Sequence, residues 1–314
     1  MTDTQPDLLT PLLARRRMSE PIACAVVHPC DPESIAGAVE AATHGLISPV
    51  LIGPQYKINA AADAAKLDIS GYRRVDTPHS HAAAAAAVAA ARAGEVAGLM
   101  KGSLHTDELM AAAVAADGLR TARRASHVFI MSVPAYARLL LITDAAINIT
   151  PDLEAKQDIA QNAIDLALIL GISQPRLAVL SAVETINPKM PSTLDAAALC
   201  KMADRGQISG GLIDGPLAFD NAISPEAAAS KGIVSQVAGR ADILLVPDLE
   251  SGNMLAKQLT YFANAASAGI VLGCRVPIAL TSRADSRIAR LASAAVMVLI
   301  AEARLFQAAA VVNA

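Results

Sequence analysis

Short apolar segments alternate along this chain with longer stretches of helical periodicity, and this alternation constrains the fold more than any other feature. Several apolar segments run without a polar break, which is typical of strands buried on both faces of a sheet. Strands separated by helices predict βαβ units and a largely parallel sheet, so the fold class is α/β. The predicted strands cover residues 22–27, 49–52, 97–100, 128–131, 139–142, 177–180, 211–213, 243–246, 270–272 and 276–280. The predicted helices cover residues 32–43, 82–93, 106–116, 153–170, 192–204, 225–231, 252–266 and 286–310.

The composition predicts a large aliphatic core. Hydrophobic residues make up 54% of the 314 residues, yet the chain has no Trp and four each of Phe and Tyr. A chain of this length is sufficient for one large domain or two ordinary ones. The alanine tract at residues 82–87 is interpreted as part of an ordinary helix, since alanine is the strongest helix former.

Charge and hydropathy exclude several classes of partner. The net charge is −3, and no basic stripe with interleaved aromatic residues indicates nucleic-acid binding. The apolar stretches are too short to span a membrane, and residues 1–17 lack the apolar run of a signal peptide. The four cysteines form no CxxC pair, so we expect reduced thiols and a cytoplasmic protein.

One predicted strand end carries a concentration of chemical groups. The apolar run at residues 276–280 is followed by Ser282, Arg283 and Asp285, and a helix is predicted directly afterwards. A guanidinium in this position can bind a phosphate through two parallel hydrogen bonds, and a carboxylate can act as a base. The alternative is a helix capping box made by Ser282 and Asp285. The two interpretations are compatible.

Three further loops follow predicted strands and hold candidate binding residues. Because ligands of open α/β sheets bind beyond the carboxyl ends of strands, these loops together predict one cleft for a phosphate-bearing ligand. Taken singly, the first is also explained as a turn with a solvated lysine, the second as a stiff, exposed loop, and the third as the start of a helix capped by Ser251. The candidate residues are Lys101, Gly102 and Ser103 in the first loop; Asp214, Gly215 and Pro216 in the second; and Ser251, Gly252 and Asn253, before Lys257, in the third.

Other familiar motifs are missing from the sequence. It contains neither GxGxxG nor GxxxxGK[ST], which argues against a nucleotide bound by those loops. It has no GxSxG nucleophile motif. Asp214 and Asp220 lack a third ligand, and His79 and His81 are interpreted as surface or capping residues, so no metal site is predicted.

Taken together, the loops make the chain resemble the phosphate acetyltransferase/phosphate butyryltransferase family from about residue 21 to about residue 301. The Thr-Ser-Arg-Ala-Asp-Ser form and the Asn-Pro-Lys-Met-Pro block look closer to the butyryl branch. The blocks that carry the resemblance are residues 100–102, 142–146, 182–191, 214–217, 237–242, 247–253 and 277–285.

This resemblance implies reversible transfer of a short acyl group, acetyl or butyryl, between coenzyme A and inorganic phosphate. Coenzyme A and phosphate are substrates, and no cofactor or metal is bound. The resemblance also implies a homodimer of two α/β domains like those of isocitrate and isopropylmalate dehydrogenases, with a cleft between them. We expect the first domain to comprise residues 1–131 with 272–314, and the second residues 132–271. The alternatives are a non-catalytic coenzyme A-binding regulator and a dehydrogenase of the same fold.

The resemblance also implies residue roles. Arg283 would clamp phosphate and stabilise the developing oxyanion, and Ser282 would hydrogen-bond the thiolate or the carbonyl oxygen. In the acetyl branch an aspartate proposed as the base stands seven positions after the serine, where this chain has Ala289. Asp285 is the nearest carboxylate, and we predict it as the base. Arg124 is the candidate for a second phosphate-binding arginine, with Arg123 as the alternative.

Overall fold

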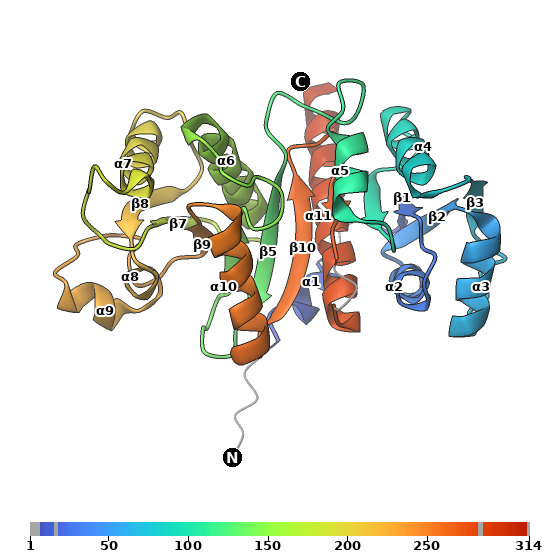
Figure 1. Cartoon of the computed structure of the whole chain (residues 1–314), viewed down its shortest axis with the longest axis horizontal. Coiled ribbons are helices and arrows are strands. Elements are labelled where there is room, and N and C mark those ends of the chain that lie inside the picture. Colours follow the sequence, from blue (N-terminus) through green and yellow to red (C-terminus); the bar gives the residue numbers. More distant parts are fainter. Residues whose placement is uncertain (1–6, 16–17, 282–284, 313–314) are drawn as a thin grey trace, which may run out of the picture. The chain divides into compact units, whose positions relative to one another are not determined.

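The computed structural model describes residues 7–15, 18–281 and 285–312, and their contacts group them into two compact units. The central unit comprises Ser126–Ser267 with Asp7 and Leu8. The terminal unit comprises Leu9–Ala125 with the described residues from Ala268 onward. Each unit has its own helices and strands (Figure 1). The α/β fold class predicted from the alternating pattern is therefore confirmed.

In the terminal unit, six strands of the sheet lie in the order β3-β2-β1-β4-β11-β10. The neighbours pair in parallel, apart from the antiparallel pair of β10 and β11. The strands are β1 (Ile22–Val27), β2 (Ile47–Gly53), β3 (Arg73–Asp76), β4 (Gly98–Lys101), β10 (Ala266–Leu272, in this unit from Ala268) and β11 (Ile278–Ala279). The helices are α1 (Thr10–Leu13), α2 (Pro32–Thr43), α3 (Gln55–Ala65), α4 (Ser80–Arg92), α5 (Thr106–Ala113) and α11 (Arg287–Val312).

The helices of this unit pack through small side chains. Helix α4 contacts β1 and α5, and α11 contacts α1 and α2 (Figure 1). The alanine tract lies within α4, where Ala83, Ala84 and Ala87 are fully buried. Because alanine adds little volume beyond the backbone, the helix can approach the sheet closely. The helical interpretation of this tract is confirmed.

The central unit has the strand order β5-β6-β9-β7-β8. Strands β6, β9, β7 and β8 pair in parallel, whereas β5 and β6 are antiparallel. The strands are β5 (Ser126–Ser132), β6 (Leu139–Thr143), β7 (Arg176–Leu180), β8 (Leu212–Leu217) and β9 (Ile243–Leu245). The helices are α6 (Leu153–Ile169), α7 (Pro191–Asp204), α8 (Phe219–Ile223), α9 (Pro225–Ser230) and α10 (Leu249–Phe262).

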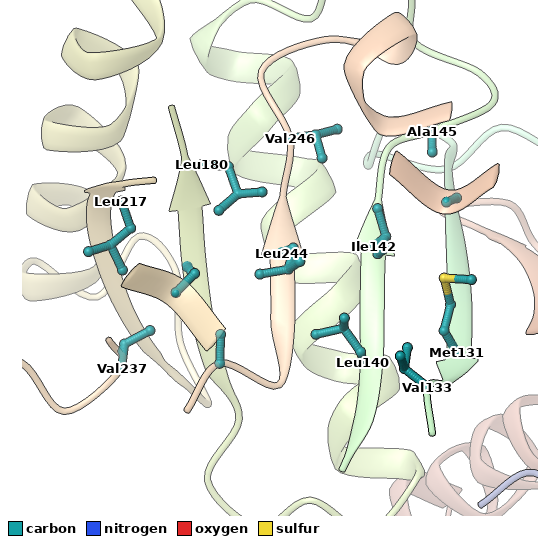
Figure 2. Close-up of a cluster of buried hydrophobic side chains, with 14 of the residues drawn as sticks. Met131, Val133, Leu140, Ile142, Ala145, Leu180, Leu217, Val237, Leu244 and Val246 are labelled. Carbon is teal, nitrogen blue, oxygen red and sulfur yellow. The ribbon is translucent and has the colours of Figure 1, made fainter. Parts of the chain in front are cut away.

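An aliphatic core fills one region of the central unit, as the composition predicts. Figure 2 shows Leu140 and Ile142 of β6 next to Leu244 of β9, and all three side chains are almost fully buried. The cluster continues through Leu180 of β7 to Leu217 of β8. Burying a leucine or isoleucine side chain contributes roughly 1.5–3 kcal/mol, so this cluster holds the four parallel strands in register.

Candidate active site

Three strand ends meet at one edge of the terminal unit's sheet. Strands β1 and β11 both run parallel to β4, so their carboxyl ends lie on the same side. Gly102 follows β4, and its N–H donates to the Val27 carbonyl at 2.9 Å. A Cβ atom at position 102 would lie 2.5 Å from the Val27 oxygen and 2.6 Å from the His28 oxygen. Glycine is therefore required because the two backbones approach so closely.

Lys101 links the end of β4 to the segment that follows β11. Its side chain is buried, with 7% of the residue exposed. The Nζ atom donates to the carbonyl oxygens of Gly102 and Thr281, each at 3.3 Å. Thr281 directly precedes Ser282 and Arg283, which lie outside the described residues. The structure thus brings the Lys101 loop and the start of the Thr281 segment together.

The helix that follows this segment has its own cap. Ser286 Oγ accepts from the Ala289 N–H at 3.2 Å, so Ser286 caps α11. Asp285 is half-buried, and its backbone oxygen accepts from Arg290 Nε at 3.3 Å. With Glu33 and Glu40 of α2, Asp285 lines a groove of about 490 Å³. The residue predicted as the base therefore faces a groove formed with α2.

Sequence reasoning missed a histidine at the same edge. His28 directly follows β1 and has a positive φ of 55°. Its Nδ1 atom lies 3.0 Å from Ser103 Oγ, and that hydroxyl donates to the His28 carbonyl at 2.8 Å. Ser103, a predicted binding residue, therefore lies against His28. The available signal was the position of His28 immediately after a buried apolar strand, the same signal that selected Lys101.

Arg124 lies elsewhere in the terminal unit. Its backbone oxygen lies near Gly273, where an added Cβ atom would approach to 2.2 Å. Gly273 follows β10, which runs antiparallel to β11, so this point is at the amino ends of β4 and β11. The structure does not bring the backbone of Arg124 to the edge that holds Lys101. The side chain of Arg124 is exposed.

In the central unit, the second predicted loop is part of a strand. Asp214, Gly215 and Pro216 lie within β8, whereas the sequence predicted a strand ending at residue 213. A Cβ atom on Gly215 would lie 2.8 Å from the Val179 oxygen of β7. The expectation of an exposed loop was wrong, because Gly215 allows β8 to continue close beside β7. Asp214 Oδ1 accepts from the Gly215 N–H at 2.8 Å.

The third predicted loop also has a different local structure. Asp248, and not Ser251, is the N-cap of α10, and its Oδ1 accepts from the Ser251 N–H at 2.8 Å. Helix α10 therefore begins at Leu249, three residues earlier than predicted. The prediction of Ser251 as the cap was wrong because aspartate also caps well and stands first. Lys257 lies on the same helix and is exposed.

Gly252 and Asn253 join α10 to the turn after β6. A Cβ atom on Gly252 would lie 2.7 Å from Val246 Cγ2 and 3.0 Å from Ala145 Cβ. Asn253 Nδ2 donates to the Ala145 carbonyl at 3.1 Å. These two candidate binding residues thus position the helix start against the Ala145 turn.

Asp144 organises that turn from inside. Only 2% of the residue is exposed, and its carboxylate accepts from the N–H groups of Ala146, Ile147 and Asn148 at 2.9–3.2 Å. The Asn148 side chain adds a bond of 2.6 Å. Burial raises the pKa of the Asp144 carboxyl, and these hydrogen bonds oppose the increase. The carboxylate is therefore a fixed part of the turn.

Within the described ranges, no group of three or more histidine, cysteine, aspartate or glutamate residues is arranged to hold a metal ion. No helix in those ranges combines the length and apolar character needed to cross a membrane.

Comparison with known proteins identifies the family. Residues 79–298 match the phosphate acetyl/butaryl transferase family. A phosphate acetyltransferase of Rhizobium meliloti is 60% identical over 301 residues, which cover 96% of this chain and 95% of the relative. The chain belongs to this family. Family membership makes it an acyltransferase, as the motif blocks predicted.

The comparisons correct the predicted branch of this acyltransferase family. A phosphate butyryltransferase of Clostridium acetobutylicum is 41% identical over 281 residues, which cover 89% of this chain and 93% of the relative. The acetyltransferase of Rhizobium meliloti is more similar, at 60%. The expected closeness to the butyryl branch was therefore wrong, because it rested on two short blocks.

Solved structures agree with the fold of the family. A branched-chain phosphotransacylase from Enterococcus faecalis V583 has a TM-score of 0.77 and is 30% identical, covering 88% of this chain and 99% of that one. A 4-hydroxythreonine-4-phosphate dehydrogenase from Klebsiella pneumoniae has a TM-score of 0.53 at 13% identity, covering 91% and 99%. The second likeness concerns the fold alone.

Proposed function

We propose that this acyltransferase moves an acetyl group reversibly between coenzyme A and inorganic phosphate. Transfer of an acyl group between these two carriers is the reaction of the family to which the chain belongs. The preference for acetyl is supported by relatives at 60% identity that are named phosphate acetyltransferase. Selectivity among acyl chains depends on pocket shape, and each methylene contributes only about 1–3 kcal/mol.

The contact between Lys101 and Thr281 carries the proposal. It supports a reacting centre built from the ends of β4 and β11, with Ser282 and Arg283 next in the chain. We assign Arg283 to clamp the phosphate and Ser282 to hydrogen-bond the thioester oxygen or the leaving thiolate. The buried ammonium of Lys101 adds positive charge beside the phosphate. Gly102 lets the end of β4 approach the backbone of Val27 and His28. Asp285 remains a candidate for the base.

The remaining candidate residues fall into two groups, those that could bind substrate directly and those that shape the surrounding elements. Ser251 and Lys257 lie on α10, and we propose that they bind substrate through their hydroxyl and ammonium groups. The other candidates in the central unit contribute to the site indirectly, by shaping the elements in which they lie. These are Asp214, Gly215 and Pro216 in β8, and Gly252 and Asn253 at the start of α10. A role for Arg124 in phosphate binding would depend on its long exposed side chain. We also propose that the protein is a homodimer, which a particle of twice the 32.3 kDa chain mass in light scattering would verify.

The test is the release of free thiol from acyl-CoA when phosphate is added. A series from acetyl-CoA to hexanoyl-CoA should give the highest kcat/KM with acetyl-CoA. Equal or higher kcat/KM with butyryl-CoA would contradict the acetyl preference while retaining the reaction. No phosphate-dependent release with any member of the series would overturn the proposed activity.

A further inference from the structure

His28 has the position and the hydrogen bonding of a catalytic base. It follows β1, whose last residue Val27 pairs with Lys101 of β4. Lys101 in turn donates to Thr281, the residue before Ser282. His28 and Thr281 therefore both adjoin the end of β4. In a transfer from acyl phosphate to coenzyme A, the thiol must lose a proton at this edge, because thiolate is the nucleophile.

The hydrogen bonds of Ser103 favour one tautomer of the imidazole. The Ser103 hydroxyl has a single hydrogen, and it donates to the His28 carbonyl at 2.8 Å. The same oxygen accepts from the Cys30 N–H at 3.3 Å. With the hydroxyl hydrogen on the His28 carbonyl, the contact of 3.0 Å between His28 Nδ1 and Ser103 Oγ is a hydrogen bond in the tautomer that carries its proton on Nδ1. With the proton on Nδ1, the neutral ring carries its basic lone pair on Nε2.

The backbone of His28 has an unusual conformation. Its φ of 55° lies in the left-handed region, which few residues other than glycine occupy. The Ser103 N–H donates to the His28 carbonyl at 2.9 Å, so both the backbone and the side chain of Ser103 hold this residue. Residues kept in sparsely populated conformations by several contacts are concentrated at functional sites.

From these contacts we propose that His28 Nε2 is the general base that accepts the coenzyme A thiol proton when acyl phosphate is the acyl donor. This role rests on the proposed acyltransferase function. The thiolate sulfur forms a bond to the acyl carbon, the bond from that carbon to the phosphate oxygen breaks, and inorganic phosphate leaves. Nε2 then gives the proton to the departing phosphate, which leaves as hydrogen phosphate, so His28 is neutral again. In the opposite direction Nε2 takes this proton from hydrogen phosphate and gives it to the departing thiolate.

The surroundings keep the imidazole neutral and ready to accept a proton. Burial lowers the pKa of His28 from its usual 6.5, and the positive charge of Lys57 on α3 lowers it further. Glu108 on α5 and Asp31 before α2 raise it, but they do not reverse the decrease. An imidazole also matches a thiol of pKa near 8.5 more closely than a carboxyl with an ordinary pKa near 4.

The experiment follows acetyl transfer from acetyl phosphate to coenzyme A between pH 5.5 and 9. The variants are His28→Asn and His28→Gly, since both residues tolerate a positive φ. Asp285→Asn tests the competing base, and His44→Gln is the control because His44 is exposed at the end of α2. Thermal unfolding followed by circular dichroism verifies that each variant folds.

We expect the unchanged protein to gain kcat/KM for coenzyme A as the pH rises through one ionisation below 6.5. His28→Asn should lower that value at least tenfold at pH 7, and the defect should shrink towards pH 9 as the thiol ionises unaided. Added imidazole should restore part of the activity of His28→Gly. His44→Gln should match the unchanged protein.

A defect of His28→Asn that is equal at every pH would overturn the role, because it would indicate positioning alone. A pH-dependent defect in Asp285→Asn and not in His28→Asn would assign the base to Asp285. Inactivity of the folded, unchanged protein with every acyl-CoA would instead contradict the proposed function itself.

Discussion

Replacing Gly102 by alanine tests the idea that the reacting edge depends on the close approach of β1 and β4. The new Cβ atom would lie 2.5 Å from the Val27 oxygen and 2.6 Å from the His28 oxygen, and both oxygens are backbone atoms. The end of β4 must therefore move by about 0.5 Å or more to reach even a tight contact of 3.0 Å.

This displacement has consequences for stability and for catalysis. It stretches the hydrogen bonds from Gly102 N–H to Val27 and from Ser103 N–H to His28, each 2.9 Å long. Weakening both and overpacking the junction should cost about 2 kcal/mol, with an apparent Tm lower by roughly 4–8 °C. Because a misplacement of about 1 Å can cost about a hundredfold in rate, we expect kcat to fall at least tenfold.

The assay combines thermal unfolding with initial rates of thiol release, and Gly71→Ala is the matched control. No atom lies within 4 Å of a Cβ built on Gly71. The control should keep both its Tm and its kcat. If Gly102→Ala also unfolds within 1 °C of the unchanged protein (roughly 0.3 kcal/mol) and keeps its kcat, the close approach is not a constraint and the reasoning fails.

Four further changes have predictable results. Lys101→Met should raise the KM for phosphate at least fivefold in initial-rate measurements, because a buried positive charge beside Thr281 is lost, and an unchanged KM would remove Lys101 from phosphate binding. Gly252→Ala should lower the apparent Tm by about 2–6 °C, because its Cβ atom would meet Val246 at 2.7 Å; an unchanged melting curve would contradict this. Arg287→Ala should change stability by less than about 1 kcal/mol in urea titrations, because the arginine in its 2.6 Å ion pair is 78% exposed; a larger loss would refute that view. Burial lowers the pKa of His127 from 6.5 to about 3, so protonation favours the unfolded chain below pH 6.5. This residue should remove about 2 kcal/mol of stability between pH 6.5 and 5, and His127→Leu should lose that part of the pH dependence in urea titrations.

The sequence predicts those elements best in which local and tertiary signals agree. Residues 22–27 and 32–43 were predicted as a strand and a helix, and β1 and α2 have these bounds. The strand is a continuous apolar run, and Asp31 caps the helix by accepting from the Ser34 N–H at 2.7 Å. Strand β3 was missed, because Arg73–Asp76 is an edge strand of largely exposed polar residues. Such a strand is defined by its pairing with β2 and lacks an apolar pattern.

Candidate site residues could be placed at strand ends, but their partners could not be read from the pattern. The sequence located Lys101 and Ser103 by their position after a strand, whereas the contact with Thr281 spans 180 residues. His28 was passed over because one histidine after a strand has no distinctive spacing. Its proposed role follows only from the contact between Ser103 Oγ and His28 Nδ1, which leaves Nε2 as the nitrogen that can accept a proton.

The three glycines of the predicted loops illustrate that a motif can combine residues needed for packing with residues that act on the substrate. Each was selected as a candidate binding residue in a loop that follows a predicted strand. In the structure Gly102, Gly215 and Gly252 each let neighbouring protein segments approach, as the contacts of an added Cβ atom demonstrate. A loss of activity on replacing any of them would therefore report displaced neighbours and not a lost ligand contact. Side chains such as Lys101 and His28, whose truncation leaves the backbone in place, are the informative tests of chemistry at this edge.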